Sequence, residues 1–273
     1  MRPGWLGALA LGAIGAVSAG CGDRDAGSLI LATTTSVQDT GLLDSLLPPF
    51  EQHAGVTVKV IAVGTGAALE MARRGDADVV LVHALDLERQ YVESGDLVGG
   101  RLVMENDFVL VGPPDDPAGA RAASTLDGAL AAIARHGPFI SRGDGSGTEV
   151  RELALWAQAG VNPASIPGRG ETGQGQGATL LVASERRAYT LTDRSTLLAL
   201  APRLTLRIVF EGDRRLVNEY RIYAVNPERH EDVAVEAGRA FIEYFASPAA
   251  QQLIGQFGTE RFGRPLFQPA AGG

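Results

Sequence analysis

The sequence has one cysteine, one lysine and four histidines among its 273 residues, so several kinds of chemistry have few residues to use. A single cysteine excludes an intramolecular disulfide. The histidines do not have the spacing of zinc ligands, so we expect no bound metal ion and no cofactor. The formal net charge of −8 comes without a basic stripe, which argues against nucleic acid as a partner.

The chain also lacks a long hydrophobic run. Residues 5–17 are apolar, but this stretch is too short and too rich in glycine for a membrane-spanning helix. It follows Met1-Arg2 and precedes the small residues 18–20, which predicts a signal peptide over residues 1–20 with cleavage before Cys21. The pattern resembles a bacterial lipobox, with Ser18 where leucine is usual, and predicts a lipidated Cys21. The alternative is an ordinary secretory signal with an incidental cysteine.

The rest of the chain alternates apolar runs with segments of helical periodicity. Strands are predicted over residues 29–34, 56–63, 77–82 and 108–112, and helices over 41–54 and 67–74. Pro48 and Pro49 predict an interruption in the first of these helices. After a Pro/Asp loop at 113–117, a second series of strands and helices follows, which indicates parallel α/β architecture.

The simplest assembly of these elements is two α/β lobes, with the second inserted into the first. We expect residues 28–111 and 221–273 to form lobe 1 and residues 112–220 to form lobe 2. The chain then crosses twice between the lobes. Two crossings make a hinge, and ligands usually occupy a cleft of this kind.

Three hydroxyl- and glycine-rich segments each follow a predicted strand and precede a predicted helix. They are residues 33–36 (TTTS), 64–66 (GTG) and 141–148 (SRGDGSGT). Helix starts carry unpaired N–H groups and a positive dipole end, so several of them at one point would surround a small anion with donors. Because a negatively charged protein repels anions at long range, such a site must rely on local donors, with Arg142 supplying the main charge.

Each segment also has a purely structural interpretation. Ser and Thr cap helices routinely, and glycines after a strand are common turn residues. Arg142 would pair on the surface with Asp144 or Glu149 in that case. The third segment is not a nucleotide-binding P-loop, because no lysine follows its last glycine.

Three further features have two interpretations each. Residues 173–177 are either a fourth helix start at the cleft or a flexible turn. Residues 189–194 either line lobe 2 or place Asp193 and Arg194 as a helix cap and a structural ion pair. His83 follows a strand and either faces the cleft or, as we expect, is a structural histidine.

Taken with their surroundings, the three segments resemble the periplasmic tungstate-binding proteins of ABC importers. The resemblance runs from about residue 29 to 269 and is carried by "LATTTSVQDTGLLDSLLPPFE", "AVGTGAALEMARRGDADVVLVHA", "ENDFVLVGP", "SRGDGSGTE", "GQGQGATLLVASERRAYTLTDRSTLL", "YRIYAVNPERH" and "FGRPLFQPAA". It implies a type II periplasmic binding protein fold that closes over tungstate or molybdate and delivers it to a permease driven by a cytoplasmic ATPase. The protein is then an extracytoplasmic monomer, attached to the membrane only through its lipid.

The resemblance also implies which residues meet the oxyanion. They are Thr34, Thr35, Ser36, Gly64, Thr65, Gly66, Arg142, Ser146, Gly147 and Thr148. The chain departs from the family pattern at Gly145, where aspartate is typical, and at Glu149, where histidine is typical. The resulting loop is closer to that of phosphate-binding proteins of the same fold.

Two alternatives to tungstate capture follow from the residues. Phosphate near pH 7 keeps a proton and needs an acceptor, and Asp144 would serve if it turned into the cleft. If Asp144 caps the next helix or pairs outward, deprotonated metal oxyanions are favoured. A secreted phosphoester hydrolase would use Ser36, Ser146 or Thr148 as nucleophile. It would need a base or a metal, and neither segment has a histidine or lysine next to it in the sequence, so we expect no enzyme activity.

Overall fold

The computed structural model describes Met1 and residues 27–271, so the predicted signal peptide and Cys21 lie outside the described residues. The first half of the described chain alternates strands and helices. Its elements are β1 (Ser28–Thr34), α1 (Thr35–Thr40), α2 (Leu42–Ala54), β2 (Thr57–Val63), α3 (Thr65–Arg74), β3 (Val79–Val82), α4 (Leu85–Glu93) and β4 (Leu97–Gly112).

The remaining elements form a second α/β series and a return to the first. The second series holds η1 (Ala120–Ala122), α5 (Leu126–His136), β5 (Ile140–Ser141), α6 (Gly147–Gln158), η2 (Pro163–Ser165), β6 (Gly170–Glu171), α7 (Gln176–Glu185), β7 (Thr190–Asp193), α8 (Arg194–Leu200), η3 (Ala201–Arg203), β8 (Arg207–Phe210) and η4 (Arg214–Leu216). The return comprises β9 (Val217–Val225), α9 (Val235–Ala246), α10 (Pro248–Gln256), α11 (Thr259–Phe262) and β10 (Gln268–Pro269).

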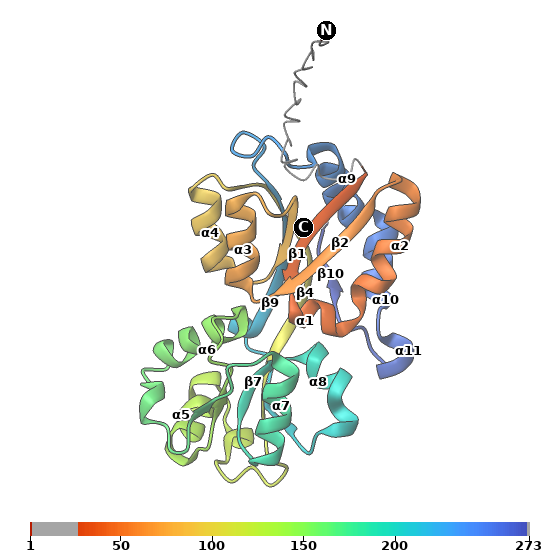
Figure 1. Ribbon diagram of the computed structural model, residues 1–273. Coiled ribbons are helices and arrows are strands. Elements are labelled where there is room, and N and C mark those ends of the chain that lie inside the picture. The colour runs from red at the N-terminus through yellow and green to blue at the C-terminus, as the bar shows by residue number, and fades with distance from the viewer. Residues whose placement is uncertain (2–26, 272–273) are drawn as a thin grey trace.

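The strands fall into two groups that share one long strand. The first group has the order β10-β4-β9-β3-β1-β2, with β1 parallel to both β2 and β3 and with β9 antiparallel to β3 and β4. The end of β4, from Phe108 to Gly112, pairs instead with β7 and β8 of the second group. Strands β4 and β9 therefore connect the two bodies seen in Figure 1.

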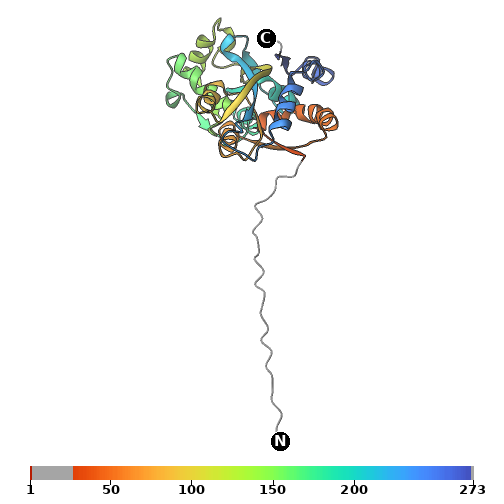
Figure 2. The same ribbon diagram turned by 90° about the horizontal axis from the view of Figure 1, so that it is seen from above.

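Helices cover both faces of the first sheet. Helices α3 and α4 lie on one side, and α2, α9 and α10 lie on the other (Figures 1 and 2). Leu31, Phe50 and Phe241 are fully or almost fully buried between the sheet and α2 and α9, while Phe139 and Trp156 belong to a separate core in the second group. Each body thus has its own hydrophobic core. Within residues 27–271, none of the helices combines the length and the hydropathy of a membrane-spanning segment.

The predicted interruption at Pro48 and Pro49 is wrong, because α2 runs unbroken from Leu42 to Ala54. Proline inside a helix costs about 3 kcal/mol. Four buried side chains of α2 (Leu42, Leu43, Leu46 and Phe50) contribute about 1.5–3 kcal/mol each, which offsets that cost. The actual break lies at Gly41, whose φ of 77° ends α1.

The sequence also predicted only the last part of β4. Strand pairing begins at Leu97 and shifts register near Arg101 and Met104, and the glycines at 99–100 and the polar residues at 105–107 interrupt the apolar pattern that would have indicated a continuous strand. The predicted lobe boundaries at 111/112 and 220/221 stay predictions. The pairing of Phe108 with β7 favours a division a few residues earlier.

Candidate functional site

The TTTS segment lies at the carboxyl end of β1. Thr34 caps α1, its Oγ1 accepting from the Val37 N–H at 3.4 Å, so the predicted capping role is confirmed. Its Oγ1 also lies 3.0 Å from Ser36 Oγ. Thr34 and Ser36 are buried, whereas Thr35 is half-buried. Two hydroxyls of this segment are therefore enclosed in the protein and hydrogen-bonded to each other.

The GTG segment begins α3. Gly64 is the N-cap residue and Thr65 and Gly66 are the first two helical residues. Thr65 is 1% exposed, and its Oγ1 has no hydrogen-bond partner among the described residues. A buried hydroxyl without a partner costs about 1–3 kcal/mol, so its presence needs an explanation. A ligand that accepts a hydrogen bond would supply one.

Arg142 is 4% exposed, so the surface position considered from the sequence is wrong. Its expected partner is nevertheless present: Nε and Nη2 donate to Asp144 Oδ2 at 3.1 and 2.5 Å. Nη1 donates to Thr148 Oγ1 at 3.5 Å. Three of the five guanidinium N–H donors are used in these bonds. The other two make no further bond to the described residues and are available to a ligand.

The rest of this loop is ordered by short-range hydrogen bonds. Ser146 caps α6 by accepting from Glu149 N, and Asp144 Oδ1 accepts from Ser146 N at 3.2 Å. Glu149, which stands where the family has histidine, accepts from Gly145 N at 2.5 Å. Gly147 and Thr148 are buried in the first turn of α6. Because Thr148 Oγ1 accepts from Arg142, its own proton is free to point at a ligand.

The three segments converge around His83, which follows β3. Ser36 Oγ lies 3.1 Å from His83 Nε2. A Cβ added to Gly147 would lie 3.3 Å from Thr65 Oγ1 and 3.4 Å from the His83 carbonyl oxygen, so α6 begins in close contact with both residues. The structure therefore brings residues from the first, second and third segments to one place.

A fourth helix start joins this cluster. Gly175 is the N-cap of α7, and a Cβ on it would lie 3.8 Å from Thr35 Oγ1. Helix α1 packs against α7 and α8, which places the start of α7 where the two bodies meet (Figure 1). Of the two interpretations of residues 173–177, the structure favours the helix start at the cleft.

His83 has more contacts than the sequence indicated. Its Nδ1 lies 3.0 Å from Asn218 Oδ1, and its ring packs on Tyr220 with centroids 4.6 Å apart. Burial lowers the pKa of His83 to about 4, against the opposing effects of the Asp193 charge and the Asn218 hydrogen bond. The imidazole is neutral at pH 7. No histidine is next to these hydroxyls in the sequence, but β1 and β3 are neighbours and bring Ser36 and His83 together.

Asp193 and Arg194 have the structural roles considered from the sequence. Asp193 caps α8 and accepts from Thr196 N at 2.8 Å and from Ser195 Oγ at 2.5 Å. Arg194 pairs with Asp107 and Glu211. Asp193 is also fully buried within electrostatic range of His83. This negative charge near the cluster was not predicted, and only its place after a strand could have indicated it.

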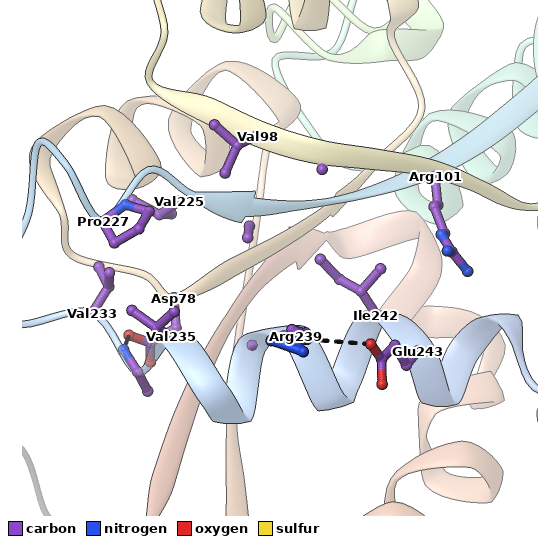
Figure 3. A pocket seen from close by; sticks show the side chains of 14 residues that line it. Asp78, Val98, Arg101, Val225, Pro227, Val233, Val235, Arg239, Ile242 and Glu243 are labelled. Atoms are coloured by element: carbon purple, nitrogen blue, oxygen red, sulfur yellow. Dashed lines mark hydrogen bonds and ion pairs between the residues drawn. The ribbon is translucent and has the colours of Figure 1, made fainter.

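Two cavities differ in their relation to this cluster. One of about 210 Å³ is lined by His83, Leu85, Arg151, Arg214, Val217 and Glu219, next to the converging segments. Another of about 330 Å³ lies between α9 and the strands β4 and β9, where Figure 3 shows Val98, Val225 and Ile242 around it. The second cavity contains none of the predicted site residues.

The fold and this cluster place the chain in a known class. Residues 19–249 match the family described as PBP superfamily domain, and the chain belongs to that superfamily. The predicted fold, two α/β lobes of the type II periplasmic binding protein kind, is confirmed.

Comparison with individual proteins is more specific. The chain is 46% identical to "Tungstate-binding protein TupA" of Peptoclostridium acidaminophilum over 252 residues, which covers 90% of this chain and 86% of the relative. A crystal structure described as the tungstate ABC transporter from Geobacter sulfurreducens is 47% identical and superposes with a TM-score of 0.78, covering 84% of this chain and 98% of that one. "Tungstate binding protein - TupA - from Desulfovibrio alaskensis G20" is 40% identical with a TM-score of 0.77, covering 90% and 99%. The predicted resemblance to tungstate-binding proteins is confirmed.

Proposed function

We propose that this chain is the substrate-binding component of an ABC importer, which captures tungstate or molybdate between its two lobes and delivers it to a membrane permease. The observation that carries this proposal is the convergence of Thr65, Arg142 and Thr148, whose spare donors come from both bodies. The similarity to tungstate-binding relatives supports the same ligand.

The donor chemistry suits a fully deprotonated XO4 dianion. The unpartnered Thr65 hydroxyl, the Thr148 hydroxyl and two Arg142 N–H groups all donate. Backbone N–H groups at the starts of α3, α6 and α7 add donors in fixed directions. Hydrogen bonds to a charged group contribute about 1.5–3 kcal/mol each, so half a dozen reach the roughly −12 kcal/mol of nanomolar binding after ordering costs.

Asp144 decides between metal oxyanions and phosphate. Both of its carboxylate oxygens are engaged, Oδ2 by Arg142 and Oδ1 by the Ser146 N–H just before α6. An acceptor used in this way is not turned toward a protonated ligand. The arrangement therefore favours tungstate and molybdate over phosphate, which we retain as the alternative ligand.

A hydrolase is the second candidate function, because Ser36, His83 and Asn218 form a nucleophile–base–orienting arrangement with distances of 3.1 and 3.0 Å. A pKa of about 4 makes His83 a weak base at pH 7, well below the range in which general bases are efficient. We therefore propose that the chain is not an enzyme. Steady hydrolysis of a chromogenic phosphate ester by the purified protein, lost in Ser36→Ala, would overturn this choice.

The partners and location follow from the same proposal. The protein acts outside the cytoplasmic membrane as a monomer, held there by a lipid on Cys21, and it meets a permease and its ATPase. Mass spectrometry of the mature protein tests the lipid, since cleavage before Cys21 with an acylated thiol gives a defined mass. Light scattering of the purified protein tests the monomer.

A thermal-shift panel tests the ligand. We expect tungstate and molybdate to raise the melting temperature most, because a ligand that binds only the folded state stabilises it by RT ln(1 + [L]/Kd). Sulfate, chromate and phosphate serve as matched tetrahedral anions. A phosphate shift exceeding that of tungstate would replace the ligand, and no shift with any of the five anions would contradict the oxyanion receptor.

A further inference from the structure

A chain of buried polar side chains passes from one body to the other through the two connecting strands. Asn106 on β4 and Asn218 on β9 are cross-strand partners in the sheet register. Every side chain of this hydrogen-bonded chain is buried. In order, the hydrogen bonds join Asp193 Oδ1 to Ser195 Oγ (2.5 Å), Ser195 Oγ to Asn106 Nδ2 (3.0 Å), Asn106 Oδ1 to Asn218 Nδ2 (2.8 Å), Asn218 Oδ1 to His83 Nδ1 (3.0 Å), His83 Nε2 to Ser36 Oγ (3.1 Å) and Ser36 Oγ to Thr34 Oγ1 (3.0 Å).

The donor and the acceptor in every bond of this hydrogen-bonded chain can be assigned by starting from Asp193. An ionised Asp193 carboxylate only accepts, so Ser195 donates to it and in turn accepts from the Asn106 amide. Asn106 Oδ1 then accepts from Asn218 Nδ2, which leaves Asn218 Oδ1 facing the histidine. His83 therefore carries its proton on Nδ1, and its Nε2 is an acceptor.

This direction has a consequence for the oxyanion site. A neutral His83 draws the Ser36 hydroxyl proton toward Nε2, and Ser36 Oγ then accepts from Thr34. Both hydroxyl protons are committed inside the protein, although Thr34 and Ser36 are among the residues that the resemblance to tungstate-binding proteins implies meet the oxyanion. A dianion without protons has nothing to offer the lone pairs that these oxygens present instead.

We propose that His83 is a positioning residue which takes up a proton from solvent when the oxyanion binds, and thereby releases the Ser36 hydroxyl to donate to the ligand. The proton is added at Nε2, which then donates to Ser36 Oγ, so the hydroxyl proton turns to the anion. The Nδ1–H bond to Asn218 is unchanged. This inference rests on the proposed function and deepens it, since it makes capture of a dianion dependent on pH.

The charges around His83 allow this change. Asp193 favours a protonated imidazole, whereas Arg142 and Arg151 disfavour it. Tyr220 packs on the ring, and Arg214 and Glu219 line the cavity beside it. In the free protein, burial dominates and keeps His83 neutral. A dianion hydrogen-bonded to Ser36 adds two negative charges close to the ring, and these charges raise the pKa of His83 toward the neutral pH range.

Titration calorimetry of the full mature protein with tungstate, between pH 6.5 and 8.5, tests the proposal. Free tungstate carries no proton in this range, so any proton taken up enters the protein. Measured in two buffers with different ionisation enthalpies, the apparent enthalpies should differ and give an uptake that rises toward one proton per anion as pH falls. Where uptake equals one, affinity should increase tenfold per pH unit lowered. Equal enthalpies in both buffers and a pH-independent affinity would overturn the proposal.

Two variants locate the proton. His83→Gln keeps an N–H donor to Asn218 Oδ1 and turns its carbonyl oxygen to Ser36, so it holds the arrangement of the neutral histidine. Tungstate should bind this variant with no proton uptake and with an affinity that does not vary with pH. The exposed His136→Gln is the matched control and should retain the wild-type uptake. Uptake that persists in His83→Gln would assign the proton to another group and refute the proposal. Failure of wild-type protein to bind tungstate at all would instead refute the proposed function, so the two failures are distinguishable.

Discussion

Replacement of Arg142 by alanine should weaken tungstate binding by a factor that the structure allows us to estimate. Arg142 has two N–H donors beyond those that bind Asp144 and Thr148. At about 1.5–3 kcal/mol for each hydrogen bond to a charged group, their loss costs about 3–6 kcal/mol, or a factor of about 10² to 10⁴ in Kd. Asp144 would also lose its partner, so its charge would oppose the anion.

The second effect is separated by changing both residues. In Arg142→Ala/Asp144→Asn the unpaired carboxylate is absent, so this double variant reports the lost donors alone and should bind more tightly than Arg142→Ala. Arg142→Lys keeps the charge but loses the planar fork, and we expect intermediate affinity. The exposed Arg135→Ala is the control for removal of one positive charge.

Calorimetry with tungstate provides the affinities, and thermal melting of each ligand-free variant confirms that it folds. If Arg142 has only a structural role as the partner of Asp144, its replacement should lower the melting temperature without changing the Kd for tungstate. Affinity within twofold of wild type in the folded double variant would therefore remove Arg142 from the site and refute the donor count.

The remaining predictions concern buried groups. Thr65→Val should raise the melting temperature of the ligand-free protein, since it removes an unpartnered hydroxyl, and should weaken tungstate binding by about 1.5–3 kcal/mol, measured by calorimetry. Burial raises the pKa of Glu152 to about 7, so between about pH 4.5 and 7 the unfolded state binds fewer protons than the folded state. The free energy of unfolding should therefore fall by on the order of 3 kcal/mol as the pH rises through that window. Denaturant melts of Glu152→Gln should lack this fall. The lowered pKa of His83 has the opposite sign: stability of the ligand-free protein should decrease as pH falls from 6.5 toward 4, and His83→Gln should remove that decrease.

The features that the sequence predicted well are those with local signals. Thr34 and Ser146 each precede a helix, and both cap it in the structure, because capping depends on residues within one turn. The strand and helix order likewise follows from hydrophobic periodicity.

The features that the sequence did not predict depend on strand order and register. Ser36 and His83 are 47 residues apart and meet only because β1 and β3 are parallel neighbours, whose carboxyl ends share one edge of the sheet. Asn106 and Asn218 meet because β4 and β9 pair in one particular register. Other polar residues stand beside both asparagines in the sequence, so nothing local distinguishes this pair or specifies which partner each one finds.

The charge balance at the cluster joins the donor count to the behaviour of His83. Arg142 and Arg151 carry one positive charge each, whereas the carboxylates of Asp39, Asp144 and Asp193 lie within electrostatic range of Arg142 or His83, so this set of groups has no excess of positive charge. The whole chain has a formal charge of −8 and offers a dianion no attraction at long range. Oriented hydroxyls and N–H groups must then hold the anion, and two of the hydroxyls are turned inward while His83 is neutral. A proton on His83 changes both the charge of the cluster and the direction of the Ser36 hydroxyl, because it adds one positive charge and turns the hydroxyl proton toward the anion. Affinity for a dianion should therefore rise on mild acidification, although the same proton destabilises the empty protein.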